Sequence, residues 1–176
     1  MTQLLTRADL DDVCVIEKEC FGKDAWNFNM LLGEYDGGSV FFGIKHCDKV
    51  VAYICARLIF DEADINNVAV LPQFRKQGMA QKLIQTLVDF CMQKNIKKFT
   101  LEVNANNLPA KNLYQKWGLK VVACAKDIIT AKMPKLCGLT RSKIDKFRLY
   151  QRIQNFFQTK RQRTKSFAFT RMGRKQ

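Results

Sequence analysis

The sequence predicts one α/β domain with a mixed central sheet and helices on its faces. Apolar and β-branched stretches, typical of strands, alternate with stretches whose apolar residues recur at helical spacing. The resulting order is β-α-α-β-β-β-α-β-α-β. A length of 176 residues suits one domain with an appendage.

The first half of the chain predicts four strands and two helices. Residues 8–20 form an amphipathic helix, because Leu10, Val13, Ile16 and Cys20 recur at helical spacing after an acid-rich first turn. The Gly37-Gly38 pair ends a second helix. Val, Ile, Phe and Tyr are typical of the strands, and residues 46–49 form a turn between two of them. The predicted strands are 3–6, 40–45, 50–60 and 64–70, and the second helix is 28–35.

The second half predicts two further helices and two further strands. Residues 79–94 show the strongest helical periodicity, with one face made of Leu83, Ile84, Leu87, Val88 and Cys91. Residues 99–103 form a strand, and the helix 110–117 begins after Pro109 and ends at Gly118. Residues 120–125 form a strand. No convincing last strand is found beyond it.

Composition excludes several classes of protein. No apolar run reaches about 18 residues, so no membrane span is expected. The seven cysteines contain no C-x-x-C spacing, which favours reduced thiols and a cytoplasmic location. His46 is the single histidine, so a zinc site with several histidines is excluded, and we expect no metal.

Charge divides the chain near Pro134. Residues 1–134 hold 17 Lys and Arg against 15 Asp and Glu, whereas residues 135–176 hold 13 against one. The sequence therefore predicts a near-neutral domain over 1–134 and a basic C-terminal extension over 135–176.

A phosphate-binding loop is indicated at residues 75–80, Arg-Lys-Gln-Gly-Met-Ala, which follow an apolar strand and open a helix. A helix N-terminus presents unpaired N–H groups and a partial positive charge of roughly half a unit. Gly78 lets the main chain approach a phosphate closely. A short glycine motif is weak evidence by itself, and the motifs that follow it strengthen the prediction.

Five motifs in order resemble the acetyl-CoA-dependent N-acetyltransferases of the GNAT superfamily, and among these the RimI-like ribosomal-protein-alanine N-acetyltransferases. The resemblance covers about residues 2–127. Its motifs are Asp61-Glu62-Ala63-Asp64-Ile65, Asn67-Val68-Ala69-Val70-Leu71-Pro72, the loop 75–80, Leu101-Glu102-Val103, and Asn107 with Leu113-Tyr114 and Gly118. It implies the GNAT fold and transfer of an acetyl group to a protein N-terminal α-amine.

The resemblance implies a role for two catalytic side chains. Acetyl transfer from a thioester requires a neutral amine, a stabilised oxyanion and a protonated thiolate. An N-terminal amine has a pKa near 8, so a carboxylate can deprotonate it, and Glu102 is the expected base. Tyr114 is the expected acid, since a phenol can donate to a thiolate. The structural alternatives are an ion pair for Glu102 and a core aromatic for Tyr114.

The remaining site residues would bind acetyl-CoA or the acceptor. The main chain of Val68, Ala69 and Val70 is expected along the acetyl and pantetheine groups, as at an exposed strand edge. Asn107 would bond the cofactor or cap its helix. Glu62 could share the base role or bind the acceptor amine. The expected phosphate-loop residues are Lys76, Gln77, Gly78, Met79, Ala80 and Gln81.

The chain departs from the family pattern at several positions. Asn104 stands in place of a usual Arg, and Leu119 in place of a usual Phe. After Ala125 the sequence keeps only a remnant, residues 126–129, with isoleucines where the relatives have tyrosines. Residues 142–159 are helix-capable, and a basic run follows at 160–163. Contact with RNA or the ribosome, a solvated extension and a divergent or frameshifted end are the three interpretations of the tail.

Three functions follow as hypotheses. The first is acetylation of a protein N-terminus, with a ribosomal protein as the partner. The second is acetylation of a small amine such as a polyamine or an aminoglycoside. The third is a non-catalytic GNAT-fold module that binds RNA through its tail.

Overall fold

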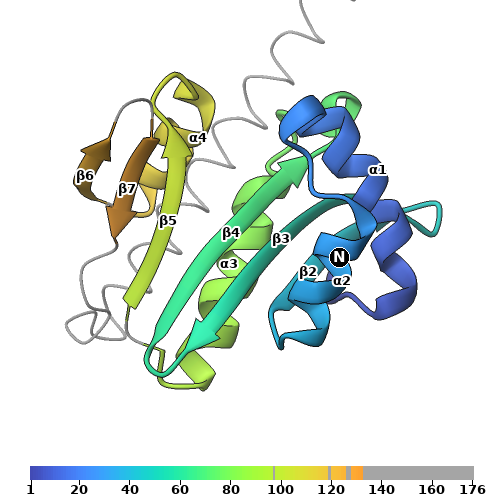
Figure 1. Ribbon diagram of the computed structural model, residues 1–176, viewed down its shortest axis with the longest axis horizontal. Helices are drawn as coiled ribbons and strands as arrows, with labels where there is room; N and C mark the ends of the chain where they lie inside the picture. Colours follow the sequence, from blue (N-terminus) through green and yellow to red (C-terminus); the bar gives the residue numbers. More distant parts are fainter. Residues whose placement is uncertain (97, 119, 126–127, 133–176) are drawn as a thin grey trace, which may run out of the picture. The chain divides into compact units, whose positions relative to one another are not determined.

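The computed structural model describes residues 1–96, 98–118, 120–125 and 128–132 (Figure 1). They belong to one compact unit, Met1–Leu136. The predicted extension 135–176, with its helix and basic run, lies outside the described residues.

Seven strands form one mixed sheet in the order β1-β2-β3-β4-β5-β7-β6. All neighbouring strands are antiparallel except β4 and β5, which are parallel. The strands are β1 (Thr2–Leu4), β2 (Val40–His46), β3 (Lys49–Ile59), β4 (Glu62–Val70), β5 (Lys98–Asn104), β6 (Lys120–Ala125) and β7 (Ile128–Lys132).

Within the described residues, four α-helices accompany the sheet: α1 (Leu10–Phe21), α2 (Phe28–Asp36), α3 (Met79–Gln93) and α4 (Leu108–Lys116). Short 3-10 turns cover Arg7–Asp9, Gly22–Asp24 and Pro72–Phe74. Helix α3 packs against β2, β3 and β4, and α1 packs against β3 and β4 on the opposite face (Figure 1). The predicted mixed sheet with helices on both faces is therefore confirmed.

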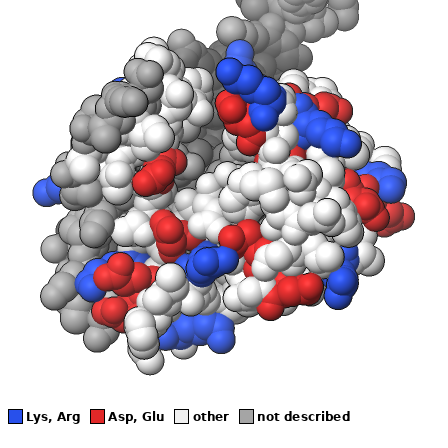
Figure 2. All heavy atoms as spheres, in the orientation of Figure 1, with Lys and Arg blue, Asp and Glu red and all other residues white. Residues whose placement is uncertain are grey.

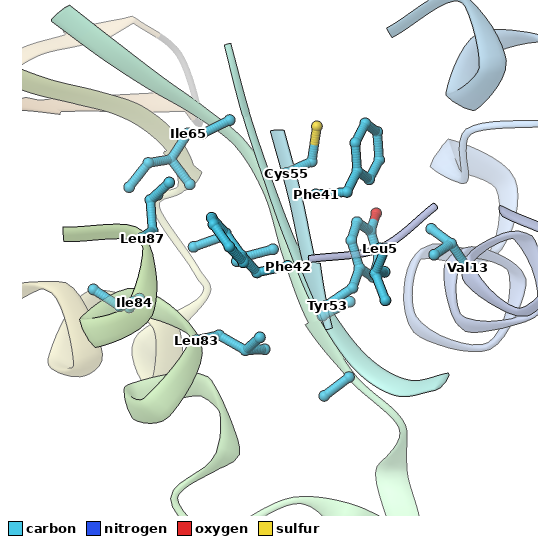
Figure 3. Packing of buried hydrophobic residues seen from close by; sticks show 14 of the residues in the cluster. Leu5, Val13, Phe41, Phe42, Tyr53, Cys55, Ile65, Leu83, Ile84 and Leu87 are labelled. Atoms are coloured by element: carbon cyan, nitrogen blue, oxygen red, sulfur yellow. The ribbon is translucent and has the colours of Figure 1, made fainter. Parts of the chain in front are cut away.

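The core lies on both sides of the strands (Figure 3). Phe42 and Ile65 point toward Leu83, Ile84 and Leu87 of α3. On the other side, Phe41, Tyr53, Cys55 and Leu5 lie toward Val13 of α1. The helical periodicity predicted that these helix positions face the core, and all of them are buried.

The expected absence of a last strand was wrong. Strand β7 lies between β5 and β6 and pairs with both, so that Glu102 is opposite Thr130. The predicted remnant 126–129 contributes Ile128 and Ile129 to it, and residues 126 and 127 lie outside the described residues. A strand of five residues gains its stability from its two neighbours and needs no strong pattern of its own.

Candidate active site

An extra residue in β4 divides the sheet into a paired half and a diverging half. Opposite β3, Ile65 pairs with Ala56 and Asn67 with Cys55, so Asn66 is left as a β-bulge. On its other side, β4 pairs with β5 from Glu62 to Ile65 only, although it continues to Val70. The bulge therefore marks the point where β4 leaves β5.

The diverging half of β4 presents main-chain groups on its β5 side. Leu71 N donates to Val51 O at 3.0 Å, so it bonds to β3. Alternate residues of an antiparallel strand bond to the same neighbour, which turns the main chain of Val68 and Val70 away from β3. Ala69, between them, is turned toward β3, and its side chain is buried.

The carbonyl of Val70 is already bonded within the protein. Arg75 Nε donates to Val70 O at 2.9 Å, and Cys20 Sγ donates to the same oxygen at 3.4 Å. The side chain of Arg75 is thus turned back to the strand end, so the first basic residue of the predicted phosphate loop supports β4.

The N-terminus of α3 has the features of an anion site. Gly78 precedes the helix with φ +78°, a left-handed conformation that favours glycine, and no side chain caps the helix there. A Cβ placed on Gly78 would meet no heavy atom within 4 Å. Lys76 also has a positive φ, of 62°. The loop therefore leaves open space beside Gly78, and no side chain caps the start of α3 at Met79, Ala80 and Gln81.

Glu102 is the first residue of β5 beyond its pairing with β4. The last pair is Ile65 with Leu101, and Glu102 follows as an exposed residue. Thr100 lies on the same face of β5, and its hydroxyl donates to Asp64 at 2.8 Å. In Figure 2 acidic side chains lie over β4 and β5 on the face that α1 covers in part. The carboxylate of Glu102 thus stands where the two strands part.

Glu62 lies at the other end of the paired half. Its Oε1 accepts from Lys98 Nζ at 2.6 Å, and this hydrogen bond raises the pKa of Lys98. Glu62 is opposite Lys98, and Glu102 is four residues further along β5, or about 13 Å at the usual strand rise. The structure therefore does not bring these two carboxylates together.

Helix α4 carries Tyr114 and begins directly after β5. Asn107 Oδ1 accepts from Ala110 N at 3.1 Å, so this side chain caps the helix. Asn104 Oδ1 accepts from Asn106 N at 2.9 Å, so the asparagine in place of the usual Arg forms the turn between strand and helix. Tyr114 packs against the core, and burial raises its pKa to about 12.

Two carboxylates near the bulge were missed by the sequence analysis. Glu17 of α1 is fully buried and accepts hydrogen bonds from Tyr53 OH, Asn67 Nδ2 and Trp26 N. Glu34 of α2 accepts from Asn66 Nδ2 at 3.1 Å. The available signal was spacing, because Glu17 falls four residues after Val13, on the apolar face of its helix.

The described part of the chain contains neither a group of three or more His, Cys, Asp or Glu side chains placed to hold a metal ion nor a helix long and apolar enough to cross a membrane.

Comparisons with known proteins place this geometry in a family. The model of the acetyltransferase (GNAT) family matches residues 9–119. The ribosomal protein bS18-alanine N-acetyltransferase of Salmonella typhimurium is 32% identical over 115 residues, which are 65% of this chain and 77% of that protein. The chain therefore belongs to the GNAT acetyltransferases, and it is related at modest identity to the RimI-like ribosomal-protein N-acetyltransferases.

Solved structures show the same fold. The ribosomal-protein-S18-alanine N-acetyltransferase of Escherichia coli superposes with a TM-score of 0.70 at 23% identity, covering 76% of this chain and 92% of that one. The PaiA N-acetyltransferase of Thermoplasma acidophilum, solved with coenzyme A, has a TM-score of 0.70 at 15% identity, covering 76% and 98%. The GNAT fold predicted from the motifs is confirmed over the described residues.

Proposed function

We propose that the chain transfers the acetyl group of acetyl-CoA to the N-terminal α-amine of a protein, with a ribosomal protein as the acceptor and the cytoplasm as the place of action. The observation that carries this proposal is the position of Glu102. This exposed residue follows the last β4–β5 pair, at the start of the opening that Val68 and Val70 border on the β4 side.

The protein has a place for each end of acetyl-CoA. The open space at Gly78 and the uncapped N-terminus of α3 suit the pyrophosphate, with Lys76 and Gln77 in the loop before it. The outward main chain of Val68 and Val70 suits an extended amide-containing arm and the acetyl oxygen. When bound, acetyl-CoA supplies an acyl thioester that an amine can attack.

Glu102 is assigned the role of general base. An N-terminal amine with a pKa near 8 is mostly protonated at neutral pH, and it must lose a proton before it attacks. A carboxylate at the opening between β4 and β5 can take that proton directly or through one water. We assign Glu62 no role in proton transfer, because its carboxylate accepts a hydrogen bond from Lys98 at the far end of the paired half.

Tyr114 is assigned the role of general acid. Burial raises its pKa to about 12, so its hydroxyl keeps its proton throughout the neutral range. A leaving thiolate has a conjugate acid near 8.5, so proton transfer from the phenol remains uphill in the ground state of the free groups. Tyr114 is therefore assigned to donate its proton to the sulfur as the C–S bond breaks, and its phenolate regains a proton from the nitrogen of the tetrahedral intermediate, so that the phenol is restored.

The acceptor class is supported by two kinds of evidence. The Salmonella typhimurium relative acts on the alanine of ribosomal protein bS18, and it shares 32% of its aligned residues with this chain. The acidic side chains over β4 and β5 favour approach of a cationic amine (Figure 2).

Asn107 would donate a hydrogen bond to acetyl-CoA from its amide nitrogen, because its amide oxygen already caps α4.

The test is an acceptor panel read by mass spectrometry. The chain is incubated with acetyl-CoA and peptides that begin with alanine or another residue, with the same peptides blocked at the N-terminus, and with a polyamine and an aminoglycoside. We expect acetylation of free N-termini and none of blocked peptides. Acetylation of lysine in the blocked peptides, or faster acetylation of a small amine, would overturn the proposed acceptor.

A further inference from the structure

The bulge in β4 is held by one carboxylate from each helix on that face of the sheet. Asn66 Nδ2 donates to Glu34 Oε2 of α2 at 3.1 Å, and Asn67 Nδ2 donates to Glu17 Oε1 of α1 at 3.1 Å. These two asparagines directly precede Val68, the first residue whose main chain faces the opening. The bulge is therefore tied to both helices at the point where β4 leaves β5.

Glu17 joins three parts of the molecule at one buried position. It accepts from Tyr53 OH of β3, from Asn67 of β4 and, at 2.7 Å, from the main-chain N–H of Trp26, between α1 and α2. All three partners are donors, so an ionised carboxylate suits them with both oxygens in use. Asn67 is thus linked through one side chain to the segment that leads into α2.

Glu34 makes a similar but more exposed set of contacts. It accepts from Ser39 Oγ at 2.7 Å, from Arg57 Nη2 at 2.7 Å and from Asn66. Its side chain is 20% exposed, whereas Glu17 is completely buried. Because Glu17 is completely buried, water cannot replace its three hydrogen bonds when they break. Loss of these bonds should therefore cost more than loss of those of Glu34.

A buried carboxylate is a costly way to fill space. Burying a charge is unfavourable unless hydrogen bonds compensate, and an apolar side chain of similar volume often gives equal or greater stability. An apolar side chain at position 17, however, cannot hold the amide of Asn67 in one orientation. The contacts of Glu17 thus indicate a function in orientation beyond packing.

We propose that Glu17, supported by Glu34, is a positioning residue that fixes the β4 bulge and so aims the main-chain groups of Val68 and Val70 at acetyl-CoA. This inference rests on the proposed function for its ligand, and it adds residues that touch neither acetyl-CoA nor the acceptor. Through Trp26 the same carboxylate couples the cofactor side of β4 to the connection between α1 and α2.

The central experiment compares Glu17→Gln with Asp12→Asn. Tyr53 and Asn67 donate to Oε1 of Glu17, and Trp26 donates to Oε2. Glutamine has nearly the same shape but only one acceptor oxygen, so it must lose either the hydrogen bond of Trp26 or those of both Tyr53 and Asn67. Asp12 is the matched control, because it is also an α1 carboxylate that accepts from a main-chain N–H, that of Val50 at 3.0 Å, and it does not contact the bulge.

Calorimetry with acetyl-CoA and thermal unfolding are measured for both variants and the wild-type chain. We expect Glu17→Gln to raise the Kd for acetyl-CoA about tenfold, and Asp12→Asn to leave it within twofold while lowering Tm. Equal Kd values for Glu17→Gln and wild type would overturn the proposal and leave Glu17 a purely structural group.

A second variant keeps the proposal testable if the Glu17→Gln chain does not fold. Asn67→Ala breaks the same link from the other side, and we expect a similar rise in Kd. Glu17→Leu removes both oxygens, so in the double variant Glu17→Leu/Asn67→Ala the two losses should not add, because each change alone removes the Glu17–Asn67 hydrogen bond. Additive losses would overturn the link between the two residues.

The result for Glu17 can be distinguished from the result of the acceptor test for the proposed function. The Kd comparison needs no acceptor, so a chain that binds acetyl-CoA but acetylates no N-terminus overturns the proposed acceptor while the role of Glu17 is still decided. A wild-type chain that does not bind acetyl-CoA overturns both.

Discussion

The two halves of β4 use the same backbone in different ways. From Glu62 to Ile65 the strand pairs with β5, and side chains close the contact, as in the hydrogen bond of Thr100 to Asp64. From Asn66 onward β4 no longer pairs with β5, and it makes hydrogen bonds to helices and loops instead. Examples are those of Asn66 to Glu34 and of Arg75 to the carbonyl of Val70. One inserted residue separates the paired interior of the sheet from the strand edge that we propose binds acetyl-CoA.

The difference shows how a sheet can contain an unpaired strand edge without losing order. Main-chain groups that leave a ladder must find other partners, and free edges are usually blunted. Here the side chains of the bulge are anchored to buried or half-buried carboxylates, which hold the strand after its neighbour has diverged. The following predictions test whether chemistry belongs to the diverging half.

Loss of the base should have the largest effect. In Glu102→Gln the amide cannot accept the proton, so the acceptor amine must lose it to solvent. We expect turnover on a peptide at neutral pH to fall by about 10²–10⁴-fold, with the rate profile displaced to higher pH. Steady-state kinetics from pH 6 to 9 measure both changes.

Glu62→Gln is the corresponding change in the paired half. It removes the negative charge that pairs with Lys98, while the glutamine oxygen can still accept a hydrogen bond, so turnover should change by less than about threefold. A larger loss for Glu62→Gln than for Glu102→Gln would transfer the base role to the paired half and contradict the comparison.

Loss of the acid should have the next largest effect. Tyr114→Phe keeps the ring packed against the core but removes the hydroxyl, so we expect turnover to fall by about 10²-fold with little change in acetyl-CoA affinity. Since the pKa of Tyr114 is about 12, the wild-type rate should not decline below pH 10 through its ionisation. Parallel losses of Tm and turnover would favour a packing role.

The anion site is tested by paired glycine changes. Gly78→Val and Gly38→Val place a side chain at φ +78° and +85°, and in both cases the added Cβ has open space. Both should lower stability to a similar degree. Only Gly78→Val should raise the Kd for acetyl-CoA, by at least tenfold or about 1.4 kcal/mol. Equal Kd values for the two variants in calorimetry would contradict the proposal that the pyrophosphate binds at the N-terminus of α3.

The smallest predicted effect concerns pH and Glu17. Burial raises the pKa of this carboxyl, although its three hydrogen bonds oppose the rise. The folded chain therefore binds the proton more tightly than the unfolded chain, so this group favours folding most at low pH. Its contribution falls as pH rises from about 4.3 through the raised pKa.

Glu17→Gln removes this dependence. The free energy of unfolding of the wild type minus that of the variant should decrease as pH rises above about 4.3, as measured by urea unfolding. Tyr53 and Cys55 face the same region, and burial raises the pKa of both above their usual ranges, so neither titrates in this window. A difference that grows with pH would contradict the sign.

Much of the fold could be predicted because its helices and long strands have strong local patterns. Helix α3 was predicted at 79–94 and lies at Met79–Gln93, and β6 was predicted with its observed bounds. Strand β7 was missed because residues 128–132 are few and lack alternation. Strand β7 is stabilised by pairing with β5 and β6, and a short stretch of sequence around residues 128–132 does not reveal that pairing.

The site was predictable where one residue type implies a conformation or a chemistry. Gly78 indicated a loop at a helix start that admits close main-chain approach, and Asn107 indicated a cofactor contact or a helix cap, of which the cap is observed. The ion pair of Glu62 with Lys98 and the contacts of Glu17 depend on the register of separated segments. The sequence could show that Glu17 interrupts an apolar stripe, but its partner Asn67 is 50 residues away.

The strand order also determines when β5 gains its second neighbouring strand during synthesis. β5 needs β7 as its neighbour beside Glu102, and β7 ends at Lys132, 28 residues after Asn104. At roughly 5–20 residues per second, the ribosome needs about 1–6 s to add that length. For this interval the newly made β5 has an open edge, so the strand that carries the proposed base is stabilised only when the described domain is nearly complete.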